Sequence, residues 1–295
     1  MYLSGFKHSP YLMVKSNSDL NNINPDFLKN KYTVRLAWDG FNSEFINKFI
    51  NKFIDIKYLD LGTFTDEKIS LDFVYKFKKL EGLVFPLWKK CDFILECDKL
   101  PKSLYSLNLN VWTKKSIINS IDALNKTNLQ HLVISGFEEK DLTILSGLTN
   151  LKSLSFKTAR IKSLKGIETL TNLKVLSFGG VRSLTDVSDI VTLQKLKFLE
   201  FDICWKMQDF SSIGKIKNLE VLHLMDCKNL ASIKFVKNMP KLRQLYTLGT
   251  TIINDFDTTP AQNIPIFFGS QDNKYNKQYP EKEIIEGQRT ESNYL

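Results

Sequence analysis

LTNLKSLSF at residues 148–156 and LTNLKVLSF at residues 170–178 are nearly the same nine residues, repeated after an interval of 22. The core of each is a leucine, two variable residues, a second leucine, one variable residue and an apolar residue. Lines with this pattern begin, at intervals of 22 or 23 residues, at Leu129, Leu151, Leu173, Leu196, Leu219 and Leu242. A fixed period in this range is typical of repeat architectures, whose units stack along one axis.

Weaker copies of the line begin at Leu104, Leu80 and Ile56, at intervals of 24 or 25 residues, which gives nine candidate repeats. Alternation within each line has period two, so each line predicts a short strand with one face toward the core. After the strand, apolar residues three apart predict a short helical or 3-10 segment. Examples of this second set are Leu142, Leu145 and Leu148, then Leu164, Ile167 and Leu170, then Val187, Ile190 and Leu193.

This pattern resembles the leucine-rich-repeat family, most closely its short type of about 22 residues, found in internalin-like bacterial proteins and in phosphatase-regulatory subunits. The LTNL motif at 148–151 and 170–173 is characteristic of that type, and the resemblance extends over residues 56–248. It implies an α/β repeat solenoid, a curved array with a concave parallel β-sheet and convex short helices or 3-10 turns. It also implies a bacterial cytoplasmic protein.

The sequence departs from the family in the column that usually holds asparagine or cysteine after the strand. Here the column reads Phe137, Ala159, Val181, Cys204 and Cys227. We expect the two cysteines to be reduced, buried and structural, because free cysteine packs as a small apolar residue.

Four parts are predicted along the chain. They are an N-terminal cap at 1–55, with helical spacing from Glu44 to Ile54, the repeats at 56–250, a C-terminal cap at 251–268, and a polar, flexible tail at 269–295.

Composition narrows the class of partner. The formal charge of +9, from 41 Lys and Arg against 32 Asp and Glu, admits an acidic protein, a nucleic acid or a membrane surface. The lysines are scattered through turns and are not interleaved with aromatics, so a nucleic-acid partner is not expected. No apolar run is long enough for a membrane span, and four cysteines suit a reducing compartment, so a cytoplasmic protein is predicted.

Motifs for catalysis are missing from the sequence. It has no glycine-rich phosphate loop, HExxH, CxxC or GxSxG, so we expect no enzyme activity, no cofactor and no metal. His131 and His223 lie four repeats apart, on the order of 20 Å at the usual strand spacing, which rules out a shared metal ion. Glu200 and His223 are neighbours in one outward column; an acid–base pair is geometrically possible, but a polar contact pair on a binding surface is favoured.

The outward positions of the last three repeats are the predicted partner-binding site, because they combine apolar anchors with charges. Its residues are Phe198, Glu200, Asp202, His223, Met225 and Tyr246, together with Lys157 from an earlier repeat. The alternative is that a cap or the tail covers them.

Two functions remain open from the sequence. The first is an inhibitor, such as an immunity protein that binds a toxin through its concave face. The second is a scaffold or regulatory subunit that positions an enzyme such as a phosphatase. In both, the chain binds a protein partner and is a monomer when alone.

Overall fold

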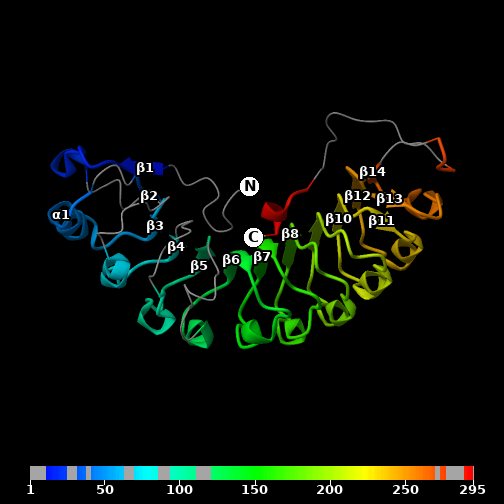
Figure 1. Cartoon of the computed structure of the whole chain (residues 1–295), viewed down its shortest axis with the longest axis horizontal. Helices are drawn as coiled ribbons and strands as arrows, with labels where there is room; N and C mark the ends of the chain where they lie inside the picture. The colour runs from blue at the N-terminus through cyan, green and yellow to red at the C-terminus, as the bar shows by residue number, and fades with distance from the viewer. Residues whose placement is uncertain are drawn as a thin grey trace. The chain divides into compact units, whose positions relative to one another are not determined.

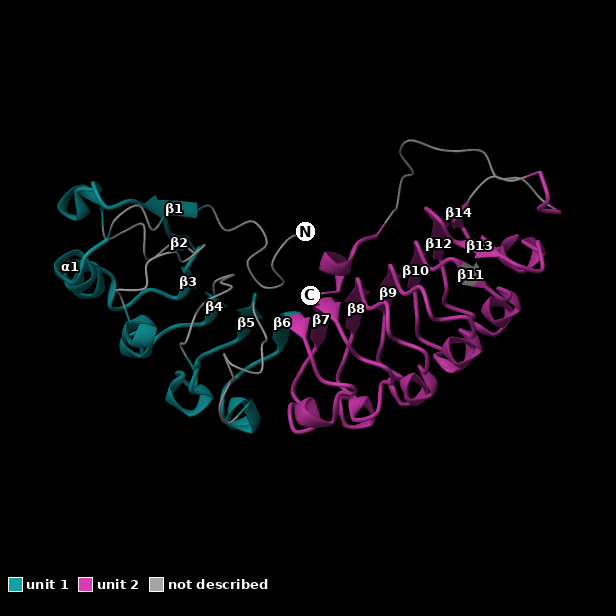
Figure 2. Ribbon diagram, viewed as in Figure 1, with its two compact units in different colours: residues 1–135 teal, residues 136–295 magenta. Residues whose placement is uncertain are grey.

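Figure 1 shows the chain as a computed structural model, which describes residues 11–24, 32–37, 41–62, 70–85, 94–110, 121–269, 273–276 and 289–294. The chain divides into two compact units, unit 1 at Met1–Ser135 and unit 2 at Gly136–Leu295 (Figure 2). Within each unit, short parallel strands alternate with 3-10 turns, which confirms the repeat fold predicted from the sequence.

Unit 1 is built on strands that pair in parallel with their neighbours along the chain. They are β1 (Tyr11–Val14), β2 (Thr33–Leu36), β3 (Tyr58–Asp60), β4 (Gly82–Phe85), β5 (Ser106–Leu109) and most of β6 (His131–Phe137). Its 3-10 turns are η1 (Leu20–Asn22), η3 (Leu71–Lys76), η4 (Cys97–Lys99) and η5 (Ile121–Lys126). Strands β1 and β2 lie within residues predicted to be a cap; they lack the leucine spacing, so the repeat pattern could not reveal them.

Helix α1 (Ser43–Phe53) in unit 1 agrees with the helical spacing read from Glu44 to Ile54. Asn42 caps its first turn, where the side-chain Oδ1 accepts a hydrogen bond from the backbone N–H of Phe45 at 2.8 Å. Apolar residues at helical spacing, Ile46, Phe49, Ile50 and Phe53, form its buried side.

Unit 2 continues the same pattern with strands β7 (Ser153–Ala159), β8 (Val175–Gly179), β9 (Phe198–Asp202), β10 (Val221–Met225), β12 (Gln244–Leu248) and β14 (Ile266–Gly269). A second, two-stranded sheet pairs β11 (Asn229–Leu230) with β13 (Ile252–Ile253). The turns are η6 (Thr143–Leu145), η7 (Ile167–Thr169), η8 (Ser188–Thr192), η9 (Ser211–Lys215), η10 (Lys234–Asn238), η11 (Thr259–Ala261) and η12 (Glu291–Asn293). Strand β14 lies in the predicted C-terminal cap and pairs with β12, so sheet pairing runs on past the last leucine line.

Parallel pairing without slippage places equivalent residues side by side in the core of unit 2. Leu154, Leu176, Leu199, Leu222 and Leu245 are aligned in register on successive strands, and all are fully buried. The rings of Phe156, Phe178 and Phe201 form a stack, with centroids 5.6 and 5.3 Å apart. Each repeat therefore buries its apolar residues mainly against its neighbours, as expected for a solenoid.

A polar ladder follows one flank of unit 2, at the residue before each opening leucine. Asn172 and Asn218 donate from Nδ2 to the carbonyl oxygens of Thr149 and Gln194, at 3.0 and 2.8 Å. Lys195 and Lys241, one repeat further on, donate to the Oδ1 atoms of these asparagines, both at 2.7 Å. From residue 172 to residue 241, asparagine and lysine thus alternate along this flank and link successive repeats.

A left-handed residue follows the strand in the later repeats. Gly180 and Gly249 have φ of +68°, and Ile203 has φ of +56° at the same repeat position. At Gly249 a side chain would collide with Asp226, whose Oδ1 lies 2.4 Å from an ideal Cβ. Ile203 is a β-branched residue in a conformation that glycine adopts at little cost.

Candidate functional site

The predicted site residues come together on one side of the sheet in unit 2, which we call the sheet face. Glu200, His223 and Tyr246 are aligned in register on β9, β10 and β12. Asp202 is aligned with Met225 on β10 and, through Gly179 on β8, with Lys157 on β7. The remaining member is Phe198, at the start of β9.

A chain of hydrogen bonds crosses the strands of the sheet face. The Ser177 hydroxyl donates to Oε1 of Glu200 at 2.9 Å, and Oε2 of Glu200 lies 3.3 Å from Nδ1 of His223. On the other side of the ring, Nε2 of His223 lies 2.9 Å from Nε2 of Gln244. The amide nitrogen can only donate, so Nε2 of His223 is the acceptor and Nδ1–H donates to Glu200. The imidazole is therefore neutral in this arrangement.

Aromatic rings flank the same histidine. His223 stacks on Tyr246 with centroids 4.3 Å apart and meets Phe198 edge-on at 5.1 Å. Tyr246 in turn contacts Phe268 of β14 at 5.1 Å. Packing on both sides fixes the ring orientation that the hydrogen bonds require.

The face is less open than the sequence suggested. Phe198 is 2% exposed, His223 7% and Tyr246 8%, whereas Asp202, Met225 and Lys157 are partly exposed. Phe198 forms a buried apolar cluster with Val175 and Val221, and Tyr294 packs against this cluster. Residues 289–294 belong to the segment predicted to be a flexible tail, but they form specific contacts with the sheet. Tyr294 packs on the cluster that contains Phe198, which agrees with the alternative that the tail covers the apolar anchors.

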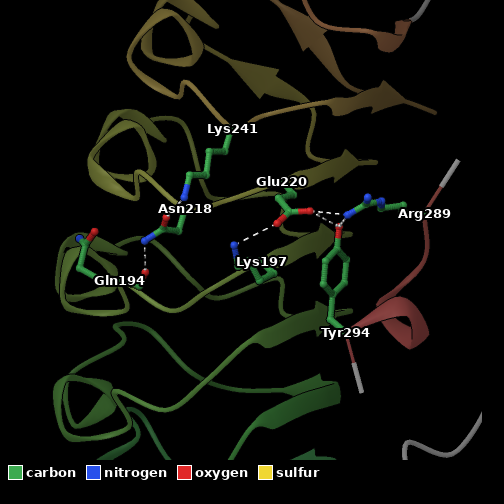
Figure 3. Close-up of polar contacts among 7 residues, drawn as sticks. All are labelled: Gln194, Lys197, Asn218, Glu220, Lys241, Arg289 and Tyr294. Carbon is green, nitrogen blue, oxygen red and sulfur yellow. Dashed lines mark hydrogen bonds and ion pairs between the residues drawn. The ribbon is translucent and has the colours of Figure 1, made fainter. Parts of the chain in front are cut away.

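Residues 289–294 bind the sheet face through polar contacts as well (Figure 3). The backbone N–H of Arg289 donates to Oε1 of Gln244 at 2.8 Å, and its carbonyl oxygen accepts from Nε2 of Gln244 at 2.9 Å. The guanidinium of Arg289 forms an ion pair with Oε2 of Glu220. The Tyr294 hydroxyl donates to the same oxygen at 3.2 Å.

Glu220 was not singled out from the sequence, although it is the centre of this arrangement. Its other oxygen, Oε1, is 2.9 Å from the Lys197 ammonium. Burial alone would raise the pKa of Glu220, but the hydrogen bonds and charges from Lys197, Tyr294 and Arg289 lower it overall. Its position is the variable second residue of the line, and no periodic signal connects it to residues 69 and 74 positions further along the chain.

The other carboxylates of the face differ in their surroundings. Burial would raise the pKa of Glu200, but hydrogen bonds from His223 and Ser177 lower it. Burial raises the pKa of Asp202, and the nearby charges of Glu200 and Asp226 raise it further. Burial lowers the pKa of Lys157, against an opposing effect of Glu291 in the C-terminal segment. Of the two carboxylates, Asp202 is therefore the one that a cation from outside would stabilise more.

A second surface feature lies at the loop after β9. Trp205 is 38% exposed, and the cationic groups of Arg182 and Lys228, from the repeats on either side, each lie 4.3 Å from its ring centroid. The leucine lines do not reveal this cluster, because its members occupy loop positions outside the strand columns.

The cysteines Cys204 and Cys227 are fully buried with free thiols, as we expected. The Cys227 Sγ lies 3.4 Å from the carbonyl oxygen of Phe201, so the column that holds asparagine in the family still contacts the backbone here. In the described part of the chain, no cluster of three or more metal-ligating side chains is found. None of the helices described has the length and apolar character to cross a membrane.

No protein-family model matches the chain, and no curated protein matches it. Among solved structures, an internalin (inlF) from Listeria monocytogenes str. 4b F2365 has a TM-score of 0.59 at 18% identity, over 90% of this chain and 75% of that one. TLR13, in its complex with ssRNA13, has a TM-score of 0.53 at 16% identity, over 75% of this chain and 34% of that one. Together with the parallel strands and 3-10 turns, these likenesses show that the chain has the leucine-rich-repeat fold.

Proposed function

We propose that this chain is a protein-interaction module, and that the sheet face of unit 2 is where it binds a protein partner. One observation carries the proposal: the face already holds a peptide segment, residues 289–294. The segment is bound by an ion pair, by two hydrogen bonds between the Gln244 side chain and the main chain of Arg289, and by a packed tyrosine. A surface with these features has the mixture of apolar anchor and polar rim that protein interfaces use.

In this proposal, exposed and partly exposed side chains on and beside the face make the contacts to the partner. Asp202 and Met225 are adjacent on β9 and β10 and offer a carboxylate beside a thioether. Trp205, with its two flanking cations, supplies an aromatic contact at the edge. Phe198, His223 and Tyr246 are mostly buried and contact one another through the His223 ring. Because Asp202 and Met225 stand on paired strands, we expect their positions to change little on binding.

The finer form of the proposal is an inhibitor, such as a cytoplasmic immunity protein that binds a toxin. The free thiols of the three described cysteines support a reducing compartment. A preformed face suits an inhibitor, since little ordering entropy is lost on binding. The alternative is a scaffold that positions an enzyme such as a phosphatase. A toxin gene beside this one would favour the inhibitor, and copurification with a phosphatase would favour the scaffold.

The test begins with a photo-crosslinking residue at Met225, on the face, and at Lys162, on the turn after β7, in cells of the source organism. Mass spectrometry of the adducts then identifies the partner. We expect a protein adduct from Met225 and none from Lys162. Calorimetry with that partner should show weaker binding for Asp202→Ala and Met225→Ala, and unchanged binding for Lys162→Ala and Lys165→Ala. The reverse pattern would place binding away from the face.

A further inference from the structure

We propose that the sheet face recognises a peptide with an arginine followed five residues later by a tyrosine, the two separated by a 3-10 turn as in η12, and that residues 289–294 occupy this site until a partner's segment displaces them. The inference rests on the proposed function and specifies the chemistry of the partner. It starts from the contacts of the segment that is already bound.

Gln244 recognises the main chain of the bound segment. Its amide forms a two-way contact with Arg289, accepting from the N–H and donating to the carbonyl oxygen of the same residue. Such a contact holds a peptide at one residue and does not depend on the side chain of that residue. Gln244 is 1% exposed, so its amide is positioned by burial and by its further contact with His223.

Glu220 selects the arginine. Its Oε1 is taken by Lys197, which leaves Oε2 to receive the Arg289 guanidinium and the Tyr294 hydroxyl. Arg289 also donates to the tyrosine oxygen at 3.2 Å, so the two side chains of the segment support each other. The second oxygen of this partly buried carboxylate can still accept a charge-assisted hydrogen bond from a guanidinium, which is stronger than a bond between neutral groups.

The apolar cluster selects the tyrosine. Val175, Phe198 and Val221 lie side by side in register on β8, β9 and β10, and the ring of Tyr294 packs on them. Phe198 has no hydroxyl of its own, so the hydroxyl that reaches Glu220 here comes from the ligand. A further preference for acidic residues is expected two positions after the arginine, where Glu291 lies near enough to Lys157 to affect its pKa.

A partner segment with this chemistry must use the same atoms, so the two occupants exclude each other. The chain's own segment is covalently attached and therefore has a high effective concentration at the site. The affinity of a competing peptide is reduced by the fraction of molecules in which the site is already filled. Opening the site should therefore increase apparent affinity without adding any contact.

The experiment uses a fluorescein-labelled peptide with the sequence of residues 287–295, GQRTESNYL, and two full-length proteins. One is the unmodified chain, and the other is an open variant that carries Arg289→Ala and Tyr294→Ala. Fluorescence anisotropy should report at least about tenfold tighter binding to the open variant. Peptides in which the arginine is alanine, or the tyrosine phenylalanine, should bind the open variant at least about fivefold more weakly.

In the open variant, Glu220→Gln should abolish most peptide binding, while Glu139→Gln, a matched change after β6, should leave it unaltered. The peptide substitutions test the same contacts if Glu220→Gln reduces folding. Equal affinity of both full-length proteins for the peptide, or indifference to the arginine and tyrosine, would overturn the inference. Sedimentation velocity adds a further outcome: a dimer of the unmodified chain that the open variant loses would mean that the occupant is the segment of a second copy, which also overturns it.

These outcomes are separate from those of the crosslinking experiment. A partner captured through Met225 together with an inactive peptide would overturn the peptide specificity and leave the binding face in place. Peptide binding to the open variant with no protein adduct at Met225 would support the specificity and contradict the proposed partner function.

Discussion

Glu81 in unit 1 and Glu220 in unit 2 occupy the same repeat position, the residue after the opening apolar residue of the line, yet their carboxylates are satisfied differently. Each pairs through Oε1 with a lysine of the preceding repeat: Lys57 at 2.7 Å for Glu81, and Lys197 at 2.9 Å for Glu220. The second oxygen of Glu81 accepts from the Tyr58 hydroxyl at 3.0 Å. For Glu220, that role falls to Tyr294 and Arg289.

The difference follows from one strand residue. Tyr58 and Phe198 are both the third residue of the line before the glutamate, so phenylalanine stands where unit 1 has tyrosine. In unit 1 the sheet supplies the hydroxyl itself, and burial together with the bond to Glu81 raises the pKa of Tyr58 to about 12. In unit 2 a hydroxyl must come from outside the repeats. The presence of this hydroxyl means that the second oxygen of Glu81 is bound within the repeats. Its absence means that the second oxygen of Glu220 can bind a ligand.

Both carboxylates are held in position by the rows of buried leucines in their units, so a charge in one of these rows should have a large effect on stability. Leu199→Asp should destabilise unit 2 by several kcal/mol, because it buries a charge without a partner. Circular dichroism during thermal unfolding would measure this. Leu59→Asp, at the same line position, should damage unit 1 in the same way. Cooperative melting of Leu199→Asp at the temperature of the unmodified chain would show that the register is wrong.

Acid should release the segment in unit 2 through Glu220, whose carboxylate binds Lys197, Arg289 and Tyr294. Burial alone would raise the pKa of Glu220, but these contacts lower it below its ordinary 4.5. The ion pair with Arg289 is therefore fully present above pH 4.5 and is lost as the pH falls through the lowered value. Occupancy of the site by residues 289–294 should stay constant from neutral pH to about 4.5 and should fall by up to about tenfold per pH unit below the lowered value.

The control must separate Glu220 from Glu200, the other carboxylate of the face. Burial would raise the pKa of Glu200, but hydrogen bonds from His223 and Ser177 lower it as well. Limited proteolysis of residues 289–294 with a protease that is active in acid, followed against pH, measures release. Glu220→Gln should lower occupancy at neutral pH and remove the dependence below pH 4.5, whereas Glu200→Gln should keep that dependence. An acid dependence that persists in Glu220→Gln would contradict this role of Glu220.

Exchanging the two strand residues tests the role of the missing hydroxyl directly. Phe198→Tyr should place a hydroxyl near Oε2 of Glu220, as Tyr58 does for Glu81, and so compete with Tyr294. We expect segment binding to weaken by about 1 kcal/mol, the usual net value of one hydrogen bond. The proteolysis assay gives the change in occupancy. The converse variant, Tyr58→Phe, is the matched control and should leave the segment's occupancy unchanged. Stronger protection of the segment in Phe198→Tyr would refute the equivalence of the two positions.

A small change in the free energy of unfolding is expected from the residue that follows β9, Ile203. Gly180 and Gly249 adopt the left-handed conformation there, and Ile203 adopts it with a β-branched side chain. Ile203→Gly should raise the free energy of unfolding by about 1 kcal/mol, because the strain of that conformation is removed. Gly249→Ala should lower it, since the new methyl group meets Asp226. Urea unfolding measures both, and a destabilised Ile203→Gly would show that packing of the side chain outweighs the strain.

Much of this fold follows from local pattern, and the site follows only in part. The leucine lines predicted strands β3 to β10 and β12, because period-two alternation depends on neighbouring residues alone. The same reasoning placed Glu200, His223 and Tyr246 in one column. It could not place Arg289 against Glu220, since that contact joins segments 69 residues apart and only one of them is repetitive. Strand β1 was not predicted either, because Tyr11–Val14 lacks the leucine spacing of the repeats.

The alternation of Asn172, Lys195, Asn218 and Lys241 on the flank sets a rule for changing the length of unit 2. Each asparagine bonds backward to a carbonyl oxygen and forward to a lysine, so the building block on this flank is a pair of repeats. Deleting the repeat that contains Asn218 would bring Lys195 and Lys241 together as like charges with no amide between them. Deleting or inserting two repeats would keep every asparagine beside its lysine. Engineered versions of the array should therefore be lengthened or shortened in steps of two within residues 172–241.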